Sequence, residues 1–309
     1  MEPTRQVPSP DHGHWAPGHT HALPRRSLMI ALIITLTSIA LICWRVPATA
    51  RDKTEDAKQA PAHETPMAKA ERAFNGGRYD DVLALAKAQR PAPRGRGPDP
   101  APSSANLLAL AARSENTRAY LGNQPKDAER RVKAARRLAR RALDLDPAHV
   151  EANLQLAISD AVRGGQVGPV RALFGGYASR ARRHLDRALE IAPDNIWALS
   201  TSGTWHLEVA RAGGGAVYGA DRTLGHDQMI RARILAPENV TIAYETALRL
   251  LASNNPEWRE AALQALTVAT QTGTPAAAHE FRLRTRAIAL AEAVETGPGA
   301  VRDFVKIYG

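Results

Sequence analysis

The chain has 309 residues, with 41 Lys or Arg against 31 Asp or Glu, so its formal net charge is +10. Its one cysteine excludes an internal disulfide and any zinc site built from several cysteines. Aromatic residues make up only 5% of the chain, which argues against a β-sandwich or β-barrel, because those folds use aromatic and β-branched runs. The composition therefore predicts an all-α fold packed on small residues.

The N-terminal region divides into three expected segments. Residues 1–26 are rich in proline and histidine without hydrophobic periodicity, which predicts a disordered tail. Residues 27–44 carry no charge, and as a helix they reach about 27 Å, so one transmembrane helix acting as a signal anchor is expected. Cleavage after Ala50 stays open as an alternative, because Ala48-Thr49-Ala50 fits a signal peptidase site. Residues 45–65 predict a flexible spacer.

The orientation of this segment is predicted from the size of the domain on its C-terminal side. Long domains are translocated largely regardless of charge, so a short tail inside and a large domain outside is expected. In a bacterium, this predicts a single-pass protein of the inner membrane with its large domain in the periplasm.

Internal repetition is the main pattern in the rest of the chain. Helical periodicity begins at Pro66 and is interrupted by a proline-rich loop at 91–104. Residues 136–147 and 182–193 match in nearly every residue class at a shift of 46, and a weaker copy ends at Pro237. Each copy is expected to close one helix, and its proline to open the next helix. Three alanines recur where two helices must approach closely: Ala142, Ala188 and Ala232.

These copies resemble the tetratricopeptide repeat, whose second helix ends in an Ala-x4-Pro of this kind. The motif's small packing residues are matched in the following helices by Ala157, Gly203 and Ala247. The resemblance implies an α-solenoid of stacked antiparallel helix pairs over 66–275, with C-terminal capping helices over 276–309. The period of 44 to 46 is longer than the ordinary 34, so the chain looks like a divergent, long-period branch. It is similar to the repeat proteins named after regulation of microtubule dynamics and to bacterial periplasmic repeat proteins associated with transporters. The extra residues are expected between the two helices of a unit, over 163–176 and 211–219.

Enzyme chemistry is not predicted by any motif in the chain. His279-Glu280 begins a metalloprotease-like string, but Leu283 stands where the second histidine is needed. The glycines at 213–215 lie between helices rather than after a strand, so they do not predict a phosphate loop. We therefore expect no catalytic residue, no metal site and no cofactor.

Two surfaces are candidates for partner binding. The resemblance implies that the first helices of successive units line a concave groove for a protein or peptide, although packing between repeats is the alternative interpretation. The expected groove residues are Glu151, Leu154, Ile158, Trp197, Thr204, Glu208, Tyr244 and Leu248. The second surface is a basic strip on two second helices, formed by Arg130, Arg131, Lys133, Arg136, Arg137, Arg140, Arg141, Arg180, Arg182, Arg183 and Arg187.

The strip is interpreted either as a solvated outer face or as a contact for anionic lipid. Nucleic acid is not expected, because no aromatic residues interleave with the basic ones. Together these features predict a membrane-anchored scaffold for protein–protein interaction at the cell envelope. The alternatives are a periplasmic ligand-binding accessory protein of a transport system, with a pocket near Trp205 and Tyr218, and self-association through a C-terminal helix.

Overall fold

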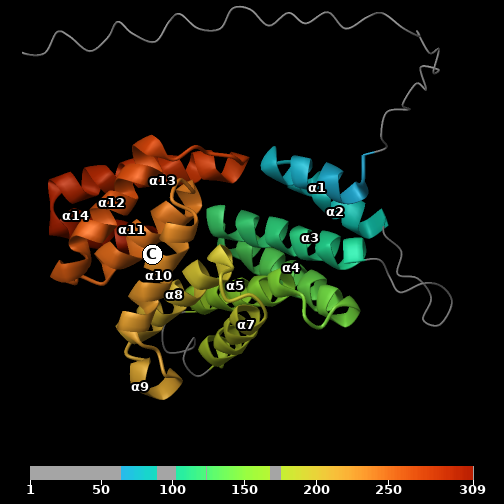
Figure 1. Cartoon of the computed structure of the whole chain (residues 1–309), viewed down its shortest axis with the longest axis horizontal. Coiled ribbons are helices and arrows are strands. Elements are labelled where there is room, and N and C mark those ends of the chain that lie inside the picture. The colour runs from blue at the N-terminus through green and yellow to red at the C-terminus, as the bar shows by residue number, and fades with distance from the viewer. Residues whose placement is uncertain (1–63, 89–101, 123, 168–174, 309) are drawn as a thin grey trace, which may run out of the picture. The chain divides into compact units, whose positions relative to one another are not determined.

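The computed structural model describes residues 64–88, 102–122, 124–167 and 175–308, all within one compact unit, Pro61–Gly309 (Figure 1). The regular secondary structure of these residues is entirely helical, which confirms the all-α prediction for this part of the chain. The expected tail, transmembrane helix and spacer, apart from the last two residues of the spacer, lie outside the described residues. None of the described helices is both long and apolar enough to span a bilayer.

The helices follow one another as packed pairs. The first pairs are α1 (Pro66–Asn75) with α2 (Tyr79–Ala88), α3 (Pro102–Leu121) with α4 (Pro125–Leu145), and α5 (Val150–Val167) with α7 (Tyr177–Ile191). Next come α8 (Ile196–Arg211) with α10 (Arg222–Leu235), joined through the short α9 (Gly215–Tyr218), and α11 (Val240–Ala252) with α12 (Arg259–Thr267). A 3₁₀ turn, η1 (Pro256–Trp258), precedes α12, and a π-helical turn, η2 (Val268–Thr272), continues it. The last pair is α13 (Ala278–Thr296) with α14 (Pro298–Tyr308).

Successive pairs stack through their first helices, since α3 contacts α5, α5 contacts α8, and α8 contacts α11. The repeated small residues lie at the closest approaches between helices. Ala142, Ala188 and Ala232 have no exposed surface. A Cβ atom added at Gly203 of α8 would lie 2.5 Å from the Cγ of Met229 and 2.7 Å from the carbonyl oxygen of Gly225 on α10. Glycine at 203 therefore allows α8 and α10 to pack closely.

The expected role of the repeat prolines at the helix starts is wrong. The helices after Pro193 and Pro237 begin three residues later, at Ile196 and Val240. Asparagine is the N-cap in both cases: the Asn195 side chain accepts hydrogen bonds from the backbone N–H groups of residues 197 and 198, and Asn239 caps α11 in the same way. A side-chain oxygen satisfies the free N–H groups of the first turn, which proline cannot do.

Three further boundaries differ from the sequence expectations. Helix α3 begins at Pro102, so residues 102–104 of the expected loop are helical, as proline is well tolerated in a first helical turn. Helix α5 runs to Val167 through two glycines, so the expected insert at 163–176 begins later. The insert at 211–219 holds the single-turn helix α9.

The C-terminal helix α13 does more than cap the last repeat. It packs on α11 and also contacts α1 and α3, which lie more than 150 residues earlier in the chain. The His279 ring lies 5.5 Å from that of Phe74, and the Arg286 guanidinium lies 5.5 Å from the Tyr120 ring centroid. Figure 1 shows α13 beside α11, with its N-terminal end directed toward α1. The two ends of the described unit are therefore packed together.

Candidate functional site

Three of the expected groove residues belong to the hydrophobic core. Tyr244 and Leu248 have no exposed surface, and Leu154 is 2% exposed. Tyr244 and Leu248 are packed in one cluster with residues of α3, α13 and α14, because α11 is enclosed by helices on several sides. The expectation that these three side chains would face a partner is therefore wrong for this conformation.

The other expected groove residues are half-buried, and most of them contact neighbouring side chains. The Glu151 carboxylate accepts a hydrogen bond from Gln155, and Ile158 packs against the cluster around Leu154. Trp197 packs beside the same cluster, and the guanidinium of Arg113 lies 4.7 Å from its ring centroid. Thr204 is half-buried. The inner side of the first helices is consequently a packed surface more than an open peptide channel.

Glu208 belongs to a buried polar network that the sequence did not reveal. Arg249 is 7% exposed in its side chain and pairs with Glu208 at 3.4 Å and with Glu245 at 3.2 Å. Tyr120 donates a hydrogen bond of 2.6 Å to Glu245. Burial and the adjacent Glu245 carboxylate raise the pKa of the Tyr120 phenol well above its ordinary value. The network links α3, α8 and α11, so Glu208 contributes to packing within the fold.

The aromatic pair considered for a small-molecule pocket is also packed internally. Trp205 is 6% exposed, and its indole N–H donates a 3.0 Å hydrogen bond to the backbone carbonyl of Ala178. Tyr218 packs against the same cluster. These contacts stabilise the junction of α7 and α8. Both rings pack against other residues of the fold, so they are not arranged around a ligand pocket.

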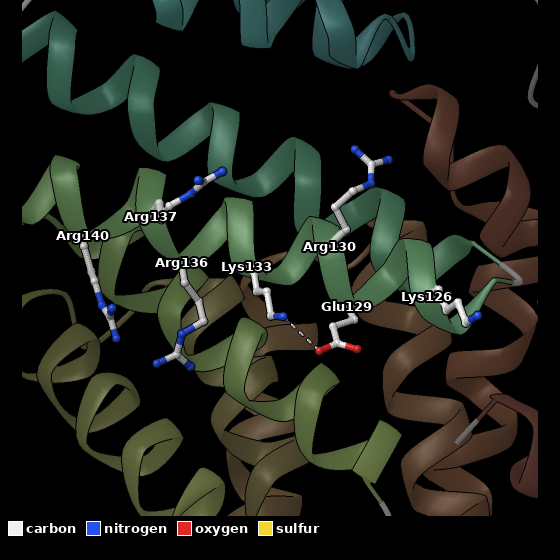
Figure 2. A pocket seen from close by; sticks show the side chains of 7 residues that line it. All are labelled: Lys126, Glu129, Arg130, Lys133, Arg136, Arg137 and Arg140. Atoms are coloured by element: carbon white, nitrogen blue, oxygen red, sulfur yellow. Dashed lines mark ion pairs between the residues drawn. The ribbon is translucent and has the colours of Figure 1, made fainter.

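An open groove lies instead along the basic helix α4. It has a volume of about 710 Å³, and its described lining consists of Lys126, Glu129, Arg130, Lys133, Arg136, Arg137 and Arg140. Figure 2 shows these side chains along one face of α4, with Arg130 and Arg137 directed to one side and Lys133, Arg136 and Arg140 to the other. We call this feature the α4 groove. Six of the seven described lining residues are cations.

The α4 groove exists because one helix carries two distinct faces. Val132, Ala135, Ala139 and Ala142 are buried against α3 and α5. The cations occupy positions three or four residues apart on the opposite side, which is the spacing of neighbours on one helix face. The strip predicted from the sequence began at Arg130 and so missed Lys126 and Glu129. Lys126 lies four residues before Arg130, so helical spacing alone could have identified it.

The ion pairs show which groove cations are already neutralised. Glu129 contacts both Lys133 at 3.1 Å and Arg163 at 3.0 Å, and these two cations lower the pKa of its carboxyl group. Arg130 pairs with Asp127 at 2.5 Å. Among the described residues, no acidic partner is found for Lys126, Arg137 or Arg140, and all three are exposed. The groove therefore retains uncompensated positive charge.

The predicted basic strip is not continuous, because several of its arginines stabilise the fold. Asp160 of α5 is 1% exposed and is shared by Arg136 of α4 and Arg180 of α7. Arg131 is 11% exposed and pairs with Glu115 of α3 at 3.0 Å. A buried carboxylate needs such partners, since an unpaired charge in a protein interior is strongly unfavourable. The α7 part of the strip is likewise mostly engaged.

Three of the four α7 arginines interact with other residues of the same chain. Arg182 donates to the backbone carbonyls of Tyr218 and Gly219, which holds the α9 segment against α7. Arg187 pairs with Glu190 on the protein surface. Arg183, like Arg141 of α4, is exposed and has no acidic partner among the described residues, but neither lines the α4 groove. The candidate site is thus narrower than the predicted strip.

A second cavity, of about 530 Å³, lies between the α1–α2 turn, the α3–α4 junction and α13. Its three aspartates, Asp80, Asp81 and Asp127, all pair with arginines within the fold. Its charge is therefore largely balanced, and the α4 groove is the stronger candidate for binding. In the described residues, no group of three or more potential ligand side chains could hold a metal ion.

In comparisons with known proteins, no protein-family model matches the chain, and the search of curated proteins gave no match.

Proposed function

We propose that this chain is a membrane-anchored, tetratricopeptide-like α-solenoid that acts as a non-catalytic scaffold for a protein partner at the cell envelope. The fold supports this proposal through helix pairs that stack in sequence order, with small residues at their closest contacts. The apolar run at 27–44 supports the anchor. Repeat scaffolds are used for many partners, so the partner must be argued from the surface rather than from the fold.

The observation that carries the proposal is the α4 groove. Its cations are concentrated on one outer helix, and three of them are not neutralised within the described fold. Keeping like charges together on one face is unfavourable by itself, so a surface of this kind is best explained by an opposite charge that it meets. We therefore propose that the partner contacts α4 and not the inner side of the first helices.

Site-specific photocrosslinking of the full-length chain in its own membrane tests this proposal. A photoreactive phenylalanine analogue would replace Lys133, a groove residue already paired with Glu129, or, as the control, Arg302 on the exposed side of α14. We expect a discrete adduct with one protein from position 133 that is absent from position 302. No adduct, or the same adducts from both positions, would overturn the proposal.

The anchor is tested separately on the same preparation. Extraction of membranes at alkaline pH should leave the full-length chain in the pellet, because a spanning apolar helix holds it there. Recovery of a soluble chain whose N-terminus is Arg51 would instead demonstrate cleavage and refute the anchored arrangement.

A further inference from the structure

We infer that the α4 groove binds an extended, acidic segment of another protein, about six residues long. This inference rests on the proposed function, because it specifies the chemistry of the partner at the same groove. The length follows from the helix: Lys126 and Arg140 are 14 positions apart, which corresponds to about 21 Å at 1.5 Å per residue. An extended chain advances about 3.3 Å per residue, so six residues span this distance.

The two rows of cations favour an extended segment. Arg130 and Arg137 point to one side of the groove, while Lys133, Arg136 and Arg140 point to the other (Figure 2). Successive side chains of an extended strand also point to opposite sides. Consecutive acidic residues would therefore meet the two rows alternately, whereas the acidic stripe of a helix would face only one direction.

The charges in the groove indicate where such a segment is held most firmly. Lys133 and Arg136 are already engaged, with Glu129 and with the buried Asp160 respectively. Arg137 and Arg140 are exposed and lack an acidic partner among the described residues. Arginine forms paired hydrogen bonds with a carboxylate through its planar guanidinium, so these two residues are the expected anchors for Asp or Glu.

The sequence argues that this segment comes from another chain. Apart from the uncharged single residues Asn123 and Gly309, the structure leaves three ranges undescribed. These are 1–63, with seven basic and five acidic residues, 89–101, with three and one, and 168–174, with one and none. Each range thus has more positive than negative charge. None of them offers the run of acidic residues that would complement the groove.

Other anionic partners fit the groove less well. Its described lining contains no aromatic side chain, whereas binding of single-stranded nucleic acid depends on aromatic residues that stack with the bases. A lipid bilayer presents a broad plane of headgroups, which would contact the rims of the groove without filling its volume of about 710 Å³. An extended acidic peptide matches the length of the groove and the two directions of its cations.

A direct binding measurement tests the inference with a defined probe. The purified full-length chain in a non-ionic detergent would be titrated into a fluorescent, end-blocked hexaglutamate peptide, with hexaglutamine as the uncharged probe. We expect the wild-type chain to bind hexaglutamate and not hexaglutamine. The double variant Arg137→Glu/Arg140→Glu should bind hexaglutamate about 10-fold more weakly, because two attractive charge pairs become repulsive. Thermal unfolding of both proteins would show that the variant remains folded.

The matched control is Arg183→Glu/Arg302→Glu, which changes the net charge equally at two exposed sites outside the groove. We expect less than about a 3-fold loss of affinity for this control, because distant charges are screened by salt. Equal weakening of both double variants would show that net charge alone attracts the peptide and would overturn the inference. Groove-dependent binding of inorganic polyphosphate or phosphatidylglycerol vesicles without hexaglutamate binding would overturn it in favour of another anion.

The outcome also separates this inference from the proposed function. A protein adduct at position 133 without hexaglutamate binding would retain the scaffold and exclude the acidic partner. Hexaglutamate binding that depends on the groove, with no protein adduct in membranes, would contradict the scaffold itself.

Discussion

The close packing of α8 on α10 gives a quantitative test of the fold. In Gly203→Ala, the new Cβ would meet the Met229 side chain at 2.5 Å and the Gly225 carbonyl oxygen at 2.7 Å. The methionine can move, but the carbonyl belongs to the backbone of α10, so the two helices must separate. Overpacking of this kind costs about 1–3 kcal/mol, which exceeds the gain of about 0.5–1 kcal/mol from replacing a helical glycine by alanine.

We therefore expect Gly203→Ala to reduce the free energy of unfolding by about 1–2 kcal/mol. For a domain of this size, that loss corresponds to a decrease in melting temperature of roughly 2–8 °C, measured by circular dichroism or calorimetry. Gly165→Ala is the matched control, since Gly165 lies in α5 and its added Cβ would have no atom within 4 Å. This control should be neutral or slightly stabilising. A Gly203→Ala protein as stable as the wild type would refute the packing of α8 on α10.

Four further predictions concern buried polar groups. Tyr244→Phe should leave stability unchanged or increase it, because the buried Tyr244 hydroxyl has no hydrogen-bond partner among the described residues; Tyr120→Phe should cost about 1–2 kcal/mol in chemical denaturation, since it loses the bond to Glu245. Asp160→Asn should cost about 1.5–3 kcal/mol in the same assay, because two partly exposed arginines lose the charge of their shared carboxylate. The melting temperature should fall as the pH decreases from 7 to 5: burial lowers the folded-state pKa of four histidines below about 6.5, so the unfolded chain takes up protons first. These histidines are His149, His184, His206 and His279.

The repeated pattern predicted the order of the helices because it depends on local periodicity. Ala142, Ala188 and Ala232 recur at a fixed place before a turn, and all three are fully buried in the structure. Such positions are set by the spacing of side chains on one helix face, which the sequence displays directly. The helix starts were less well predicted, because a cap depends on which nearby side chain reaches the free N–H groups. Asn195 and Asn239 do so, and the prolines before them only form the turn.

The predicted groove was wrong at Tyr244 and Leu248 because their surroundings come from distant parts of the chain. Both lie in a cluster with Leu121 of α3 and Leu283 of α13. Nothing in the local sequence of α11 indicates that α13 will fold back against it and reach α1 as well. An aromatic residue on a first helix is therefore equally compatible with a peptide anchor and with the core, and here the return of α13 makes it core.

The same dependence on distant partners explains why the sequence alone could not distinguish the arginines of the basic strip that stabilise the fold from those that are available for binding. Arg136 and Arg137 are adjacent in the chain, yet their side chains have different tasks. Arg136 helps to neutralise Asp160, a buried carboxylate 24 residues later, whereas Arg137 is exposed in the α4 groove. The two side chains are separated by a rotation of about 100° about the helix axis. The position of α5 therefore decides which arginine forms an ion pair within the fold. Substituting the whole strip at once would therefore change the stability of the fold and binding at the groove together. Arg136→Glu should unfold the α4–α5–α7 junction, while Arg137→Glu should leave stability intact and weaken only the groove, so the adjacent pair distinguishes a structural cation from a binding one.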